Sequence, residues 1–297
     1  MRRRRSFFTG AQPTPRGERR QRGLPLPLNS LTNVAAWDDP EWRGVSRSLG
    51  LSQDEGWLHR KAYEWTHCIY GLERLGVLGA TRRVLGVAAG HECTLYYLAN
   101  RSEVTIATDL YAGGFADSHA AEANRDFLTQ PEKYAPFPYR SEGLIALPAD
   151  ALALPFDRGS FDVVYSLSSI EHFGGHHRAA EGIREMARVL KPGGICCLAT
   201  EYVMRGPQHN EYFNASDLDH WVIGASADLR LVGPFDRSEP PQQYFDDPVP
   251  LPENPYHHPH VVLRRDDVLF TSVVLFFEKR GRRRRLVDKV RSLVAAR

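Results

Sequence analysis

The residues from Val84 onward combine a short apolar run, a turn of small residues and a helix-like segment that begins at Cys93. Such a strand–turn–helix unit directs backbone N–H groups and a helix N-terminus toward a ligand. About twenty residues later Asp109 ends a second apolar run, where its carboxylate can accept hydrogen bonds from both ribose hydroxyls of a nucleoside. This spacing indicates a nucleoside site, without deciding between a dinucleotide and another adenosine compound.

The elements that must position this unit alternate between strands and helices, which predicts an α/β fold with a parallel sheet covered on both faces. A helix expected over Gln53–Leu75 has Ser52 and Glu55 as a capping box and ends at Gly76. A second helix is expected over residues 178–190, before Lys191-Pro192-Gly193-Gly194. The expected strands are Val84–Val87, Val104–Thr108, Leu144–Ala146, Phe161–Ser166, Ile195–Thr200 and Thr271–Phe277.

Three motifs, of which this unit is the first, occur in order along the pattern. Val84–Glu92 is rich in small residues, Ala149-Asp150-Ala151 precedes the strand at Phe161, and Glu185–Gly194 ends a helix before the strand at Ile195. Together they resemble the class I S-adenosylmethionine-dependent methyltransferases, in particular those that act on small molecules, lipids and sugars. The resemblance runs from about Arg83 to Leu198. It implies a Rossmann-like, doubly wound sheet of seven mostly parallel strands with an antiparallel last strand.

The resemblance also implies roles for individual residues toward S-adenosylmethionine. Asp109 would bind the ribose and Leu110 would lie against the adenine, while Asp150 and the backbone N–H of Ala151 would bind the adenine edge. The residues expected beside the methionine part are Gly86, Ala88 and Gly90, with Ser166 near the sulfonium.

The first motif departs from the family pattern. Gly86 stands where the family often has an acidic residue, and Ala88 and Glu92 each replace a glycine. We expect Glu92 to take the place of the missing acidic partner of the cofactor's ammonium group. The alternative is that Glu92 only stabilises the start of the following helix through the helix dipole.

A general base is expected directly after the strand at Phe161. His172 would lie near the transferred methyl group by the resemblance, and histidine titrates in the useful range. Glu171 is the second candidate. In the alternative interpretation, this pair only closes the strand-to-helix turn.

Other histidines lie at 176–177 and 257–260, but they lack carboxylates or cysteines at a firm ligand spacing, so no metal site is predicted. Residues 234–260 are rich in Pro, Asp and His and contain no periodic segment. This long loop is either a substrate lid, lined by Tyr244, Phe245, Tyr256 and His257, or a solvated connection.

The 297 residues carry a net charge of +2, unevenly distributed. Residues 1–23 hold eight Arg and one Glu, residues 281–297 hold seven Lys or Arg and one Asp, and the remaining body holds 23 basic and 34 acidic side chains. An acidic body is a poor nucleic-acid surface, so no nucleic-acid partner is expected. The basic amphipathic tail at 281–297 either docks on the body, lies weakly on an anionic membrane or is disordered.

Four cysteines without a C-x-x-C pair indicate a reducing compartment, and the sequence lacks a signal peptide and an apolar run long enough to span a bilayer. The predicted location is cytoplasmic. Any contact with the inner membrane surface would be made by the basic tails. The predicted domains are a disordered basic arm at 1–30, a helical cap at 31–80, a methyltransferase domain at 81–280 and the tail.

We therefore expect an S-adenosylmethionine-dependent methyltransferase that acts on a hydroxyl of a small-molecule or glycan acceptor. If the basic tails contact a membrane, this acceptor would be lipid-linked. Two alternatives stay open. The first is a non-catalytic module that keeps the fold and binds the cofactor. The second, a nicotinamide-dependent oxidoreductase, is disfavoured because the glycine motif does not match G-x-G-x-x-G and no second mononucleotide half is visible.

Overall fold

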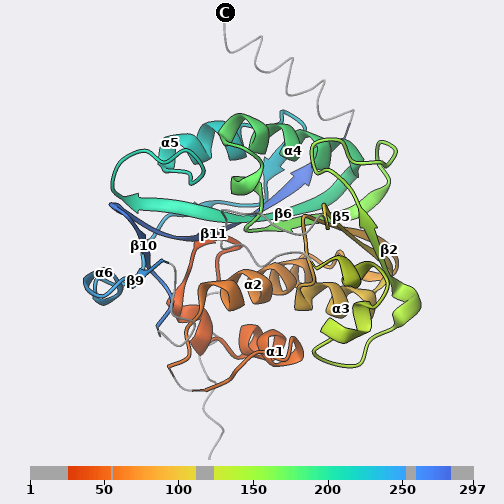
Figure 1. Ribbon diagram of the computed structural model, residues 1–297, viewed down its shortest axis with the longest axis horizontal. Coiled ribbons are helices and arrows are strands. Elements are labelled where there is room, and N and C mark those ends of the chain that lie inside the picture. The colour runs from red at the N-terminus through yellow and green to blue at the C-terminus, as the bar shows by residue number, and fades with distance from the viewer. Residues whose placement is uncertain (1–25, 55, 112–123, 252–258, 282–297) are drawn as a thin grey trace, which may run out of the picture.

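The computed structural model describes residues 26–54, 56–111, 124–251 and 259–281 (Figure 1). Its helices are α1 (Pro40–Ser48), α2 (Arg60–Arg74), α3 (Cys93–Ala99), α4 (His176–Val189), α5 (Ala215–Asp217) and α6 (Gln243–Asp246). Its strands are β1 (Asn29–Leu31), β2 (Gly79–Val87), β3 (Ser102–Asp109), β4 (Leu144–Pro148), β5 (Phe161–Leu167), β6 (Leu190–Arg205), β7 (Leu229–Leu231), β8 (Phe235–Asp236), β9 (Val249–Pro250), β10 (Leu263–Arg265) and β11 (Val268–Lys279).

One sheet organises the molecule, in the order β4-β3-β2-β5-β6-β11, with β7 on the outer edge of β11. The first five of these strands are parallel, and β11 runs antiparallel to β6. The chain moves outward from β2 to β4 and then returns to the other side of β2. The doubly wound α/β class is therefore confirmed, and the expected antiparallel strand is β11.

The described residues add four short strands, β1, β8, β9 and β10, to the seven expected, so the sheet has eleven strands. The disordered arm was expected to extend to residue 30, but its predicted end is too late, because Asn29–Leu31 forms a strand that pairs with β11. The Asn29 side chain explains this pairing: its Nδ2 donates to Val232 O at 2.8 Å, and its Oδ1 accepts from the Phe276 N–H at 2.7 Å. The edge of β11 that β7 leaves unpaired thus pairs with Asn29–Leu31.

Helices cover both faces of the sheet. Figure 1 shows α1, α2 and α3 on one face and α4 with α5 on the other. Each face has its own apolar core, one built around α2 and α3 and the other around α4. Gly71 lets α2 lie close to β11, since a Cβ there would come within 2.2 Å of the Phe276 ring. This contact fixes the last turn of α2 against β11.

The helix expected over Gln53–Leu75 begins only at Arg60. The preceding residues pair with a distant segment, because the His260 N–H donates to Leu58 O at 2.7 Å and the Arg60 N–H donates to His260 O at 2.8 Å. His59, rather than Ser52, caps the helix, and Glu55 lies outside the described residues. The helix does end where expected, with Gly76 at a φ of 63°.

The expected loop at 234–260 contains β8, α6 and β9, which its sequence did not reveal because each is four residues or shorter. Tyr244 is buried against Val261 and Val262 instead of lining an open lid. Tyr256, His257 and the tail at 282–297 lie outside the described residues. In the described part of the chain, no helix has the length and apolar character needed to cross a membrane.

Candidate active site

Backbone strain gathers at the carboxyl edge of the sheet. Four non-glycine residues of the described ranges have positive φ, and three of them follow neighbouring strands: Ala88 after β2 (50°), Tyr111 after β3 (45°) and Ser168 after β5 (49°). Left-handed conformations at such residues cost about 1 kcal/mol or more each and cluster at functional sites. The strain therefore marks the position where the strand order reverses, between β2 and β5, as the candidate site.

Asp109 ends β3 at this edge. Its carboxylate accepts from the Gly90 N–H at 3.0 Å and from the Leu110 N–H at 2.7 Å. Burial raises the pKa of this carboxyl, while these N–H groups oppose the change. The carboxylate thus ties the glycine-rich turn to the end of β3.

The glycine-rich turn keeps the backbone of a glycine at Ala88, whose φ of 50° is the left-handed conformation. Gly86 has a packing reason to lack a side chain, because a Cβ there would lie 2.9 Å from both the Ala89 Cβ and the Tyr165 hydroxyl. A Cβ at Gly90 would meet nothing within 4 Å, so this side of the turn is open. Both Ala88 and Gly90 have positive φ, so the turn adopts left-handed backbone at both positions.

The adenine side of the candidate site is exposed. Leu110 shows 50% of its surface, an unusual fraction for a leucine next to a buried strand. Asp150 is exposed and accepts from the Leu152 N–H at 2.9 Å, and Ala151 is buried beside it. These residues lie after β3 and β4, which are neighbours in the sheet.

Glu92 and Ser166 lie on the inner side. Burial raises the pKa of the Glu92 carboxyl to about 7, although the charge of Lys61 favours its ionised form. The Thr94 hydroxyl donates to Glu92 Oε2 at 3.3 Å. Ser166 is fully buried on β5, and its hydroxyl has no hydrogen-bond partner among the described residues.

The two predicted catalytic residues differ in access. The His172 side chain is 24% exposed, and its Nδ1 lies 3.9 Å from Glu211 Oε2. Burial lowers its pKa below the usual value, so the ring is neutral at pH 7 and able to accept a proton. Glu171 is fully buried and accepts from the Thr200 hydroxyl at 2.8 Å.

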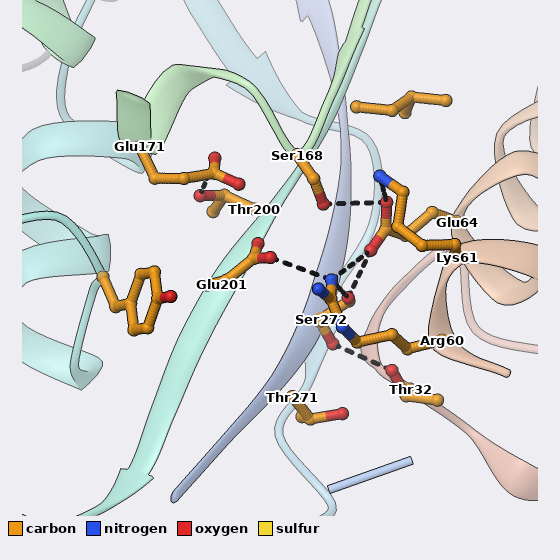
Figure 2. Close-up of polar contacts among 12 residues, drawn as sticks. Thr32, Arg60, Lys61, Glu64, Ser168, Glu171, Thr200, Glu201, Thr271 and Ser272 are labelled. Carbon is orange, nitrogen blue, oxygen red and sulfur yellow. Dashed lines mark hydrogen bonds and ion pairs between the residues drawn. The ribbon is translucent and has the colours of Figure 1, made fainter. Parts of the chain in front are cut away.

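A buried charge cluster beside these residues was missed in the sequence (Figure 2). Glu64 on α2 lies 3.1 Å from the Arg60 guanidinium and 2.7 Å from the Lys61 ammonium. It also accepts from the Ser168 hydroxyl after β5, at 2.8 Å, and from the Ser272 hydroxyl on β11. Arg60 reaches on to Glu201 of β6 at 2.8 Å. The cluster fastens the first turn of α2 to three strands.

One sequence signal could have revealed part of this cluster. Arg60 and Glu64 are four residues apart on a helix rich in aromatic residues, where an unpaired buried charge would be costly. Their partners Ser168, Glu201 and Ser272 are more than a hundred residues away, and no local pattern identifies them.

The donor set fits a nucleoside with an amino-acid tail. It offers a carboxylate at the end of β3, an exposed apolar side chain beside that carboxylate, and an open glycine turn. At its inner end an acidic and a basic side chain, Glu92 and Lys61, lie near each other and complement an ammonium and a carboxylate. This combination suits S-adenosylmethionine.

Comparison with known families decides the domain type. A family model described as a methyltransferase domain matches residues 85–198, from β2 into β6. Residues 85–198 form a class I S-adenosylmethionine-dependent methyltransferase domain. The cofactor of this family is S-adenosylmethionine, as the sequence predicted. The methyltransferase domain contains all eleven predicted site residues.

Individual relatives match parts of the chain. The human "Probable tRNA methyltransferase 9B" is 39% identical over 79 residues, which cover 27% of this chain and 17% of that protein. "Methyltransferase GfsG" of Streptomyces halstedii is 33% identical over 138 residues, which cover 45% of this chain and 42% of that protein. The solved structure of the YcgJ protein from Bacillus subtilis is 18% identical with a TM-score of 0.44, covering 71% of this chain and 97% of that one.

The chain thus spans less than half the length of these curated relatives. Their names divide between tRNA methyltransferases and methyltransferases of other acceptors. An example of the second kind is "27-O-demethylrifamycin SV methyltransferase" of Amycolatopsis mediterranei. It is 41% identical over 59 residues, which cover 20% of this chain and 21% of that protein. The shared part is the methyltransferase domain, while the acceptor differs among the relatives.

Proposed function

We propose that this protein transfers the methyl group of S-adenosylmethionine to a hydroxyl of a small-molecule or glycan acceptor. The observation that carries the proposal is the strained carboxyl edge of the sheet, where Ala88, Tyr111 and Ser168 follow three neighbouring strands and the Asp109 carboxylate holds the Gly90 N–H. The bound cofactor would supply a methyl group on a positively charged sulfur. The protein would align the acceptor with that group and exclude water.

The described contacts support a division of the cofactor site. Asp109 and Leu110 would hold the ribose and the adenine face, and Asp150 with Ala151 the adenine edge. Gly86, Ala88 and Gly90 would cradle the methionine part, with Ser166 near the sulfur. Glu92 would bind the ammonium and Lys61 the carboxylate, which adds a residue of α2 to the predicted set.

The acceptor would enter beside His172 and Ser168, where the first turn of α2 meets the end of β5. The acidic body of the chain, with 34 acidic and 23 basic residues between positions 24 and 280, favours a small acceptor over a polyanion. All four cysteines are free thiols, which supports a cytoplasmic site of action. Membrane contact through the basic tails stays a prediction.

Cofactor binding should depend on pH through Glu92. Its pKa of about 7 means that the carboxyl is mostly protonated at pH 6, whereas a neighbouring ammonium favours the ionised form. Affinity for S-adenosylmethionine should therefore rise about tenfold from pH 6 to pH 8, with release of a proton at pH 6. Calorimetric titration in two buffers of different ionisation enthalpy measures both effects.

The controls isolate the carboxyl. Glu92→Gln should bind more weakly and remove the pH dependence, and 5′-methylthioadenosine, which lacks the ammonium group, should bind equally well at both pH values. If the affinity of wild-type protein is the same at pH 6 and pH 8, Glu92 is not the partner of the ammonium group.

His172→Ala should lower kcat about 100-fold or more when the acceptor is a hydroxyl, because general-base catalysis is lost. Cofactor affinity should remain within about twofold, since His172 lies outside the cofactor contacts. His177→Ala is the matched control, because that side chain is 68% exposed on α4 and should not matter. Full turnover in His172→Ala would remove His172 as the base.

A tRNA acceptor is the second candidate, favoured by the names of the tRNA methyltransferase relatives. A radiolabelled-methyl assay distinguishes the two. The protein is incubated with labelled cofactor and either total tRNA or a set of hydroxylated macrolides, phenols and sugars. Label on a small molecule alone supports the proposal, and label on tRNA alone overturns it. Cofactor binding without transfer to any acceptor would favour the non-catalytic module.

A further inference from the structure

Two buried carboxylate oxygens near His172 have no donor. Glu171 is fully buried and Glu201 is 4% exposed. Glu171 Oε1 and Glu201 Oε2 are each buried without a hydrogen-bond partner among the described residues. The other oxygen of each group is satisfied, Glu171 Oε2 by the Thr200 hydroxyl at 2.8 Å and Glu201 Oε1 by Arg60 at 2.8 Å. A buried acceptor without a donor is costly, and two in one place need a common explanation.

The two glutamates are neighbours. The charge of Glu201 acts directly on Glu171, and Figure 2 shows both carboxyl groups on the same side of the Arg60 cluster, with the Thr200 hydroxyl bound to Glu171. A proton between Glu171 Oε1 and Glu201 Oε2 would turn two unsatisfied acceptors into one hydrogen bond. Two carboxylates that share a site also retain one proton because their like charges repel.

We propose that Glu171 and Glu201 share one proton, carried by Glu171, and that the single negative charge, held on Glu201 by Arg60, controls the protonation of His172. This inference rests on the proposed function only for the role of His172. The shared proton itself is a property of the folded chain and needs neither cofactor nor acceptor.

The surrounding charges agree with this arrangement. Burial raises the pKa of Glu171 well above its usual range, and the charge of Glu201 adds to the effect. Arg60 and Lys61 face Glu64 and Glu201, so with Glu171 neutral the two cations balance two anions. The titratable and charged groups about the pair and His172 are Arg60, Lys61 and Glu64 on α2, Glu211 and Tyr212 in the segment after β6, and Arg265 on β10.

The pair connects α2 to the candidate base. Burial lowers the pKa of His172, and the charge of Glu201 is the first influence that raises it again. Arg60 of α2 holds that charge in place. Helix α2 therefore affects the pKa of His172 without contacting the histidine. Glu171 and Glu201 are positioning residues in this sense.

Glu171→Gln tests the location of the proton. A glutamine amide imitates the protonated carboxyl, since it can donate to Glu201 and accept from Thr200. In the wild-type protein the folded state holds a proton that the unfolded chain loses above about pH 4.3, so the folding constant should fall about tenfold per pH unit relative to the variant. Urea unfolding should give similar stability at pH 4.5 and, because the folded protein keeps the proton, an advantage for Glu171→Gln of about 200-fold at pH 7. A constant difference across this range would overturn the shared proton.

The location of the charge is tested by the His172 ring signals in NMR titrations, assigned by comparison with His172→Gln. Glu171→Gln should leave the midpoint of His172 unchanged, because the charge on Glu201 remains. The double variant Glu171→Gln with Glu201→Gln should lower it. A drop in the single variant as large as in the double variant would place the charge on Glu171 and overturn the assignment. If the double variant does not fold, the single variant still decides.

Because the unfolding experiment contains no cofactor, its failure leaves the methyltransferase proposal intact. Conversely, a protein that transfers no methyl group would still show the pH-dependent difference between the wild-type protein and Glu171→Gln.

Discussion

Asp109→Ala should weaken binding of S-adenosylmethionine about 100-fold. The carboxylate is placed to accept from two ribose hydroxyls, and each hydrogen bond to a charged group contributes about 1.5–3 kcal/mol. Two such bonds correspond to a factor of about 100 or more in Kd. Calorimetric titration with S-adenosylmethionine and S-adenosylhomocysteine measures the change, which should be similar for both because they share the ribose.

The control lies on the same strand. Glu103 is exposed near the start of β3, at the opposite edge of the sheet, so Glu103→Ala should bind the cofactor like the wild-type protein. Asp109 also holds the Gly90 N–H at 3.0 Å, so thermal unfolding of the variant should be recorded beside the titration. A folded Asp109→Ala protein with wild-type affinity would remove Asp109 from the ribose site and with it the main support for the proposed cofactor geometry.

Asp109 shows which features the sequence could predict. Strand β3, the turn after β2 and helix α3 are consecutive segments, and their hydrophobic patterns are local. The position of a carboxylate at the end of β3 then follows from the parallel arrangement alone. The same reasoning placed Asp150 after β4 and His172 after β5, because successive parallel strands end at one edge of the sheet.

The features that were missed depend on distant pairings. The start of α2 is decided by His260, two hundred residues away from Arg60, and β1 forms because β11 offers a free edge. No local pattern contains either fact, and the capping signal at Ser52 was a reasonable but incorrect guide. The charge cluster was missed for the same reason, since Glu64 is next to Ser168 and Ser272 only in the folded chain.

Ala88 is an intermediate case. The sequence has a methyl group at this position, where the family pattern has a glycine. In the structure Ala88 keeps the left-handed backbone, at a φ of 50°, although this conformation is strained for a residue with a side chain. A neighbouring non-glycine residue in the same conformation, Ser168, binds Glu64 of α2. Contacts from the cap helix thus help to maintain the strained edge on which the proposed site depends.

This dependence leads to the largest expected loss of stability. Glu64→Ala should lower the free energy of unfolding by about 3–5 kcal/mol, because it removes the partner of two cations that are largely out of water. The hydroxyls of Ser168 and Ser272 lose their acceptor as well. Urea unfolding at pH 7 measures the loss.

The loss of stability at acidic pH provides a second test of the contribution of Glu64. The pKa of Glu64 is lowered by Lys61 and Arg60 despite its burial. A carboxyl with a lowered pKa stabilises the fold above its usual pKa, and that contribution is lost as the pH falls through the lower value. The stability difference between wild-type protein and Glu64→Ala should therefore be full at pH 6–7 and shrink below about pH 4.

Glu73→Ala is the matched control on the same helix. Its side chain is 38% exposed, lies 3.6 Å from Arg101 and accepts from the Tyr97 hydroxyl, so its removal should cost about 1–2 kcal/mol, well below the loss expected at Glu64. If Glu64→Ala were no more harmful than Glu73→Ala, the cluster would contribute little to stability, and α2 would be held by its apolar face against Phe276 and its neighbours alone. The strain at Ser168 would then need another source of stabilisation than the cap helix.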